Sequence, residues 1–188
     1  MDEPYIAPEE WHSRLYKAGF TQIEASISDT EPPFRVNATF MARTARQDFV
    51  PERVTLLSKG FVDKPARHVE RMLLEMGCKV QHVLWGSTTP IQQDIISFIE
   101  LEGPLFEGIT DTDMEFFQGL VKSLRNVKIL WLMKPAQLHV DDPRFGLSLG
   151  MIRTIRSELG LAFATLELDD ATSSNSTRAI TDVFKHIR

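Results

Sequence analysis

Hydrophobic residues follow two alternating patterns from residue 53 to the end of the chain. Short apolar runs alternate with stretches in which apolar residues recur at helical spacing. The apolar runs predict buried strands at residues 54–58, 79–85, 94–100, 127–133 and 162–168. Short strands that alternate with helices are typical of a mainly parallel sheet covered by helices on both faces. We therefore predict a doubly wound α/β domain over residues 53–188.

Several predicted helices have recognisable starts. Pro65 fits the first turn of a helix, where its missing N–H costs no hydrogen bond. Thr112 and Glu115 have the Thr-x-x-Glu spacing of a capping box, and the apolar residues of 116–124 follow them. A turn rich in Ser and Asn at 172–176 precedes a last amphipathic helix, whose apolar positions are Ile180, Val183, Phe184 and Ile187.

Residues 146–170 pair one helix with one strand, as in the closing half of a Rossmann-like βαβ unit. The apolar positions that predict the buried face of this helix are Met151, Ile152, Ile155 and Leu159. The other face carries Arg153, Arg156 and Glu158, which we interpret as a solvated surface with Glu158 as the local counter-charge. An anionic partner for the two arginines is the alternative. Gly160 is expected to end the helix.

Residues 1–43 follow a different pattern. A proline and two glutamates at residues 8–10 are typical of a helix start, since acids favour the positive end of the helix dipole. Strand-like runs follow at 20–27 and 35–41, and turn-forming residues separate them. Charged residues and a proline make 44–52 the predicted linker to the α/β domain.

Composition excludes several classes of function. The 188 residues suit one ordinary domain, or one domain and a fragment. A net charge of −5 gives no electrostatic support for a nucleic-acid partner. The single Cys78 excludes a disulfide framework and a multi-cysteine zinc site. No apolar run approaches the roughly 20 residues of a membrane span, and the acidic N-terminus is wrong for a signal peptide. We expect a soluble, cytoplasmic protein without a membrane partner.

The turn after the first predicted strand of the α/β domain does not have the pattern of a phosphate loop. A dinucleotide site needs several glycines there, because backbone amides must reach the pyrophosphate. Gly60 is the only glycine in this turn, and Asp63 adds a charge that repels phosphate. An S-adenosylmethionine site would also need a Gly-x-Gly loop. We therefore interpret this segment as a simple strand-to-helix turn.

Candidate catalytic and metal-binding groups are few. Ketone reduction in the short-chain dehydrogenase manner uses a tyrosine as proton donor, and Tyr5 and Tyr16 both lie outside the α/β zone. Cys78 follows a predicted helix end, where nothing lowers its pKa, so we expect a small buried side chain. No pair of histidines has metal-ligand spacing, and we expect His82 at the core or the sheet edge. The histidines are His12, His68, His82, His139 and His186.

Asp169 and Asp170 follow the last predicted strand, at the position where α/β folds bind ligands. Because no glycine-rich loop accompanies them, we interpret the two aspartates as a turn and a helix cap.

Two regions of the chain carry distinctive motifs. In the α/β zone these are Gly150-x-x-Arg153-x-x-Arg156-x-Glu158, Thr165-Leu-Glu-Leu-Asp169, Ile129-Leu-Trp131 and Pro143-x-x-Gly146-Leu. This region resembles the region upstream of the enoyl reductase in fungal highly reducing polyketide synthases. Near the N-terminus the motifs are Glu10-Trp11, Leu15, Ala18-Gly19-Phe20 and Asn37-Ala-Thr-Phe-Met-Ala42. This second region is similar to the C-terminal end of a class I methyltransferase.

The resemblance implies a division of the chain and a role for it. Residues 1–43 would end a C-methyltransferase domain, 44–52 would link, and 53–188 would form a pseudo-ketoreductase with a truncated Rossmann-like fold. Such a domain is a noncatalytic structural segment between the methyltransferase and the reductive domains. No catalytic, cofactor-binding or metal-binding residue carries over to this chain.

The resemblance also implies cofactors and partners of the parent synthase. The parent would use S-adenosylmethionine, NADPH and phosphopantetheine, none of them bound by this segment. The partners of the segment would be the neighbouring methyltransferase, enoyl reductase and ketoreductase domains, and the parent would be a homodimer of the acyltransferase class.

Two other functions are compatible with the sequence. A small stand-alone Rossmann-like enzyme would need polar residues that converge at the carboxyl ends of the strands, with Lys59 as the phosphate ligand. The available residues for such a site are Ser58, Lys59, Ser87, Thr88 and Asp169. A free interaction module of the flavodoxin-like type would need acids at the end of its first strand, where Ser58 and Lys59 stand instead.

Overall fold

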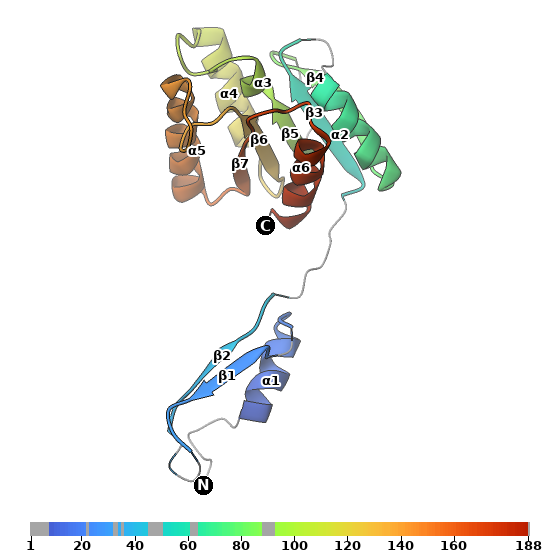
Figure 1. Ribbon diagram of the computed structural model, residues 1–188. Helices are drawn as coiled ribbons and strands as arrows, with labels where there is room; N and C mark the ends of the chain where they lie inside the picture. Colours follow the sequence, from blue (N-terminus) through green and yellow to red (C-terminus); the bar gives the residue numbers. More distant parts are fainter. Residues whose placement is uncertain are drawn as a thin grey trace. The chain divides into compact units, whose positions relative to one another are not determined.

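The computed structural model divides into two compact units, Met1–Asp48 and Phe49–Arg188 (Figure 1). We call them unit 1 and unit 2 and treat each by itself. The division falls within the predicted linker, of which residues 45–50 lie outside the described part. The structure describes residues 8–21, 23–31, 34, 36–44, 51–60, 64–87 and 93–187.

The described residues of unit 1 form one helix and one strand pair. Helix α1 (Pro8–Lys17) starts at the predicted proline. Strands β1 (Ala25–Ser28) and β2 (Ala38–Met41) pair in antiparallel fashion and are shorter than the predicted runs. The Asp29 carboxylate accepts backbone N–H bonds from Val36 and Asn37 at 3.2 and 2.9 Å, which hold the two strands together at their turn.

Unit 2 contains a five-stranded parallel sheet, as predicted. Its strand order is β4-β3-β5-β6-β7, and every pairing is parallel. The inner strand β6 is entirely apolar and buried because both faces of the sheet are covered there, whereas the edge strand β4 carries polar residues between its valines. The strands are β3 (Arg53–Ser58), β4 (Lys79–Leu84), β5 (Asp94–Phe98), β6 (Ile129–Met133) and β7 (Phe163–Glu167).

The strand order identifies a truncated doubly wound sheet. It equals the Rossmann order 3-2-1-4-5-6 without its third strand, and it is also the order of flavodoxin-like folds. Only residues 85–93 separate β4 from β5, too few for the additional strand and helix that a complete Rossmann sheet has at this point. The winding direction changes between β3 and β5, so the switch point of the sheet lies at these two strands.

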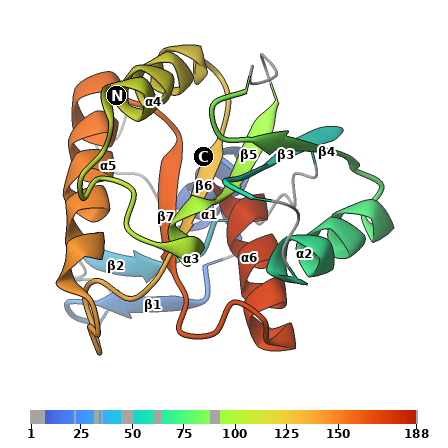
Figure 2. The same cartoon turned by 90° about the horizontal axis from the view of Figure 1, so that it is seen from above.

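Helices cover both faces of the sheet (Figure 2). Helices α2 (Lys64–Glu75) and α6 (Ser174–His186) pack together on one face, over Val54, Leu56 and Ile96. Helices α4 (Asp111–Ser123) and α5 (Gly146–Leu159) cover the other face, over Leu57, Ile95 and Trp131. Two short helices, α3 (Ile99–Glu102) and the 3-10 helix η1 (Pro143–Phe145), lie in the connections.

The predicted capping box of α4 is wrong by two residues. Thr110, not Thr112, caps the helix, because its Oγ1 accepts the backbone N–H of Asp113 at 3.1 Å. Thr112 already lies in the first helical turn and is exposed. Two Thr-x-x-acid pairs overlap at this point in the sequence, so spacing alone could not separate them.

The predicted buried face of α5 is half right. Ile152 and Ile155 are buried against the sheet, but Met151 is 37% exposed and Leu159 is 57% exposed. The helix instead buries Ser148 and Leu149 at its first turn. Gly160 ends the helix with a φ of 61°, a left-handed conformation that glycine adopts without strain.

Candidate functional site

A cleft of about 340 Å³ lies at the carboxyl ends of β5, β6 and β7. This is the edge where open α/β sheets bind ligands. The floor of the cleft is apolar and includes Phe98 and Leu168, while its rim carries two lysines and three acids. The lining residues are Lys64, Pro65, Phe98, Leu101, Glu102, Lys134, Leu168, Asp169, Asp170, Ala171 and Thr172.

Of the residues considered for a stand-alone enzyme site, the cleft contains Asp169 alone. Ser58 is buried and donates its hydroxyl to the carbonyl of Gly60 at 3.0 Å. Lys59 and Ser87 are exposed and do not line the cleft, and Thr88 lies outside the described residues. The structure therefore does not bring this set together in one described pocket. Lys64 and Lys134 could attract an anion at the cleft, but the three acids on the same rim oppose it.

Glu100 is a fully buried acid that the sequence analysis missed. The chain leaves β5 at Phe98 and turns at once into α3, which places Glu100 beside Met133 of β6. Its Oε1 accepts the backbone N–H of Leu105 at 2.8 Å and the hydroxyl of Ser148 on α5. The available signal was an acid directly after the apolar run 95–99, where a turn would ordinarily carry it to solvent.

The environment of Glu100 favours its protonated form. Burial raises the pKa of the Glu100 carboxyl and outweighs the hydrogen bonds from Ser148 and Leu105 and the charge of Lys59. The Trp131 indole also acts to lower the pKa, although its Nε1 does not reach full hydrogen-bond geometry. Within the described part of the chain, three buried side-chain atoms lack a full hydrogen bond, namely Ser97 Oγ, Glu100 Oε2 and Trp131 Nε1.

Asp113 joins the end of β4 to the start of α4. Its Oδ1 accepts the indole N–H of Trp85 at 2.6 Å, and its Oδ2 accepts the hydroxyl of Thr110 at 2.7 Å. These two hydrogen bonds, with a smaller effect from Lys59, lower the pKa of the Asp113 carboxyl. The polar groups of this corner therefore bind one another.

Glu167 closes the opposite corner of the edge. Its carboxylate accepts the backbone N–H groups of Ala136 and Gln137 at 2.8 and 3.1 Å, and the Gln137 amide at 2.6 Å. Desolvation raises the pKa of Glu167, but the three hydrogen bonds together outweigh it and leave the pKa lowered. Gln137 in turn accepts a hydrogen bond from Arg153 at 3.0 Å, so the loop after β6 is fastened to both β7 and α5.

The interpretation of Glu158 as the counter-charge of Arg153 and Arg156 is wrong. Among the described residues, neither arginine forms an ion pair with Glu158. Arg153 donates a hydrogen bond to the neutral amide of Gln137, and its charge helps to lower the pKa of Glu167. The two arginines do lie on an exposed surface, as predicted. They line an open hollow of about 560 Å³ with Ser157, Gly160 and Leu161.

The two aspartates after β7 form a turn, as predicted, but neither caps the next helix. Asp170 Oδ1 accepts the backbone N–H and the hydroxyl of Thr172, at 2.8 and 2.6 Å. The cap of α6 is Ser173, whose hydroxyl accepts the N–H of Ser176 at 3.1 Å. A serine hydroxyl serves this position as well as a carboxylate does, so composition could not decide between them.

The remaining candidates occupy structural positions. Cys78 is buried, as predicted, and burial raises the pKa of its thiol. His82 lies on the edge strand β4, where its Nε2 is 3.0 Å from Glu70 Oε1. Tyr16 is exposed on α1, and Tyr5 lies outside the described residues. In the described part of the chain, His, Cys, Asp and Glu nowhere form a group of three that could bind a metal ion.

No helix within the described ranges is both long enough and apolar enough to cross a membrane.

Comparison with known proteins gives consistent relatives. The highly reducing polyketide synthase gloL of Glarea lozoyensis is 41% identical over 187 residues, which cover 100% of this chain and 7% of the relative. The highly reducing polyketide synthase FUM1 of Gibberella moniliformis is 32% identical over 97% of this chain and 8% of the relative. The squalestatin hexaketide synthase of a Phoma species is 33% identical over 98% of this chain and 7% of the relative. No protein-family model matches the chain.

The similarity runs through both units, and the chain spans only 7–8% of the length of these curated relatives. It therefore corresponds to one segment of a much longer multidomain protein. We conclude that the chain belongs to the fungal highly reducing polyketide synthases, of which it represents one segment.

Proposed function

We propose that this chain is a noncatalytic structural segment of an iterative highly reducing polyketide synthase. In this proposal, unit 2 is a pseudo-ketoreductase that packs between the methyltransferase and the reductive domains. Unit 1 is the C-terminal end of the methyltransferase domain. The segment binds neither S-adenosylmethionine nor NADPH, which other parts of the parent synthase use.

The observation that carries the proposal is the use of polar groups at the carboxyl edge of the sheet. Ser58, Glu100, Asp113, Glu167 and Asp170 each make hydrogen bonds within the chain that fix the loops of this edge. A catalytic site needs polar groups aimed at a substrate instead. The internal hydrogen bonds favour a scaffold over an enzyme.

Unit 1 supports the assignment to a larger domain. None of its described residues is buried, and Ile27 and Phe34 are 73% and 77% exposed. A helix with a two-stranded sheet cannot bury enough apolar surface to be stable alone. The exposed side chains of unit 1 are those that a missing remainder of a domain would cover.

Isothermal titration calorimetry of the 188-residue chain tests the absence of cofactor binding. We expect no heat of binding with NADPH or with S-adenosylmethionine. A micromolar dissociation constant for either ligand would overturn the proposal. The parent synthase, which would bind both ligands, serves as the positive control.

Turnover of the parent synthase separates a scaffold from a catalytic role. Substitution of the cleft residues Lys64→Ala, Lys134→Ala and Asp169→Ala should leave product formation unchanged, since these side chains lie on the surface of the cleft. The core substitution Trp131→Ala should lower turnover, because it destabilises the fold of a domain that holds its neighbours in place. Loss of turnover with intact folding in the Asp169→Ala variant would instead favour a catalytic role for the carboxyl edge of the sheet.

A further inference from the structure

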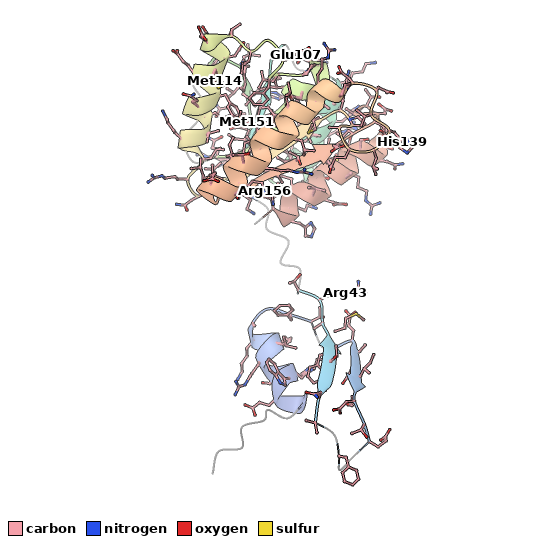
Figure 3. All side chains as sticks on the ribbon, turned by 90° about the vertical axis from the view of Figure 1, so that its left-hand side faces the viewer. Arg43, Glu107, Met114, His139, Met151 and Arg156 are labelled. Atoms are coloured by element: carbon pink, nitrogen blue, oxygen red, sulfur yellow. The ribbon has the colours of Figure 1, made fainter. Side chains whose placement is uncertain are left out.

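Exposed apolar side chains of unit 2 gather on α5 and on the loop before it. Among the described residues of unit 2, seven large apolar side chains are exposed, and five of them lie between residues 138 and 159. Leu74 on α2 and Leu84 on β4 are the other two. The five residues of the cluster are Leu138, Val140, Leu147, Met151 and Leu159. Together with Arg153 and Arg156 we call them the α5 surface, of which Figure 3 labels Met151 and Arg156.

The α5 surface combines an apolar flank with a basic flank. Leu147 and Met151 are four residues apart, so they lie one turn apart on the same side of the helix. Arg153 and Arg156 are three residues apart and lie on the other side, where they line an open hollow. Ile152 is buried against the sheet, whereas the side chains of both flanks are exposed.

The loop that contributes Leu138 is held in place from two sides. Gln137 bonds to Glu167 of β7 and accepts a hydrogen bond from Arg153. Farther along, Arg144 pairs with Asp142 at 2.7 Å and with Glu107 at 2.6 Å. A surface that is already ordered loses little conformational entropy when a partner binds. The hydrogen bonds and ion pairs of unit 2 therefore hold these apolar residues in their exposed positions.

The charge of the α5 surface specifies the partner. Neither Arg153 nor Arg156 forms a close ion pair within the described ranges, although the charge of Arg153 acts on the nearby Glu167 carboxylate, and the chain carries a net charge of −5. A partner with carboxylates would complement them. A second copy of this chain fits poorly, because Glu158 is the only acid on α5 and a symmetric contact would place arginines near arginines.

We propose that the α5 surface is the docking site for another folded domain of the same synthase, one that presents apolar side chains bordered by carboxylates. The proposal rests on the scaffold function proposed above and identifies the surface that performs it. The relatives are long enough to hold such a partner in the same polypeptide, since this chain covers only 7–8% of their length. Tethering within one chain raises the effective concentration, so a modest surface suffices.

Hydroxyl-radical footprinting with mass spectrometry tests the proposal without a substitution. The reactivity of Met151 and Leu147 is compared between the 188-residue chain and the intact parent synthase. We expect both to react roughly fivefold more slowly in the parent, because a partner excludes solvent from the side chains it covers. Leu74 on α2 is the matched control and should react equally in both. Equal reactivity of Met151 in the two proteins would overturn the proposal.

Charge reversal tests the acidic part of the partner. In the parent synthase, Arg153→Glu with Arg156→Glu should restore the reactivity of Met151, whereas Arg71→Glu on α2 should not. Protection of Met151 that survives the reversal would overturn the acidic partner. Protection already present in the 188-residue chain, with a dimer mass by sedimentation, would assign the surface to a second copy. Cofactor binding at the carboxyl edge would contradict the scaffold function but leave the footprint unchanged, so the two failures are distinguishable.

Discussion

Units 1 and 2 differ in how many of their described side chains are buried from solvent. In unit 2, two apolar clusters fill the space between the sheet and its helices on either face. In unit 1, no described residue is buried, although α1, β1 and β2 are formed. Local hydrogen bonds and caps are therefore sufficient to define secondary structure in both units. Only unit 2 adds the apolar burial that supplies most of the free energy of folding.

The largest expected difference is in independent folding. Residues 49–188 alone should unfold cooperatively in urea, with the same midpoint as unit 2 within the whole chain. Residues 1–48 alone should show no cooperative transition by circular dichroism, because they bury too little apolar surface to offset chain entropy. A sigmoidal unfolding curve for residues 1–48 would abolish the distinction between the units.

A matched pair of aromatic truncations should sharpen the comparison. Trp131→Ala removes a fully buried side chain that contacts Trp85, Phe117 and Phe163, and should lower the free energy of unfolding by about 3–5 kcal/mol. Phe40→Ala on β2, which is only half-buried, should leave the unfolding of unit 2 unchanged. Urea denaturation followed by circular dichroism measures both. Similar losses for the two variants would contradict the contrast in burial.

Glu100 gives the interior of unit 2 a dependence on pH that unit 1 does not share. Because the pKa of Glu100 is raised in the folded state above its ordinary value of 4.5, the folded chain keeps a proton that the unfolded chain releases. The contribution of this group to stability is therefore fully present below pH 4.5 and is lost as the pH rises through the folded pKa. Glu100→Gln should remove this dependence, and urea midpoints measured across the pH range would detect the change.

The hydrogen bonds of Glu100 can be tested separately from its charge. Below pH 4.5, where Glu100 is protonated in both states, Glu100→Ala should cost about 2 kcal/mol, because the N–H of Leu105 and the hydroxyl of Ser148 lose their buried acceptor. Glu100→Gln keeps an oxygen acceptor and serves as the control. If the glutamine and alanine variants had the same stability at low pH, these hydrogen bonds would not contribute to folding.

The smallest expected effect concerns the start of α4. Thr110→Ala removes the N-cap and should lower the stability of unit 2 by about 1 kcal/mol. Thr112→Ala, in the exposed first turn, should change stability little and is the matched control. Equal losses of stability from the two substitutions would contradict the assignment of Thr110 as the helix cap.

The strands of unit 2 could be predicted because a parallel sheet is apolar on both faces and leaves continuous runs in the sequence. The orientation of α5 could not, since Met151 and Leu159 fit the helical period as well as Ile152 does. Which side of the helix is buried depends on how it crosses β6 and β7, and this is a tertiary property.

The candidate site was harder to predict than the fold. Glu100 could not be recognised, because its two bonding partners, Leu105 and Ser148, come from a loop and from a distant helix. Asp169 and Asp170 were placed correctly at the carboxyl edge, since the end of β7 follows from its apolar run. Their roles depend on their neighbours, because Asp170 bonds to Thr172 and Ser173 takes the position of the helix cap.

The packing of the tryptophans gives each unit its own optical signal. The rings of Trp85 and Trp131 are centred 6.3 Å apart and inclined at 78° inside unit 2, a separation at which two indoles couple their excited states. Far-ultraviolet circular dichroism should therefore contain an exciton couplet from these two indoles of unit 2. Trp11 on α1 is 41% exposed and should fluoresce at the longer wavelengths of a hydrated indole. Assembly of either unit into a larger protein can thus be followed by spectroscopy without an added label.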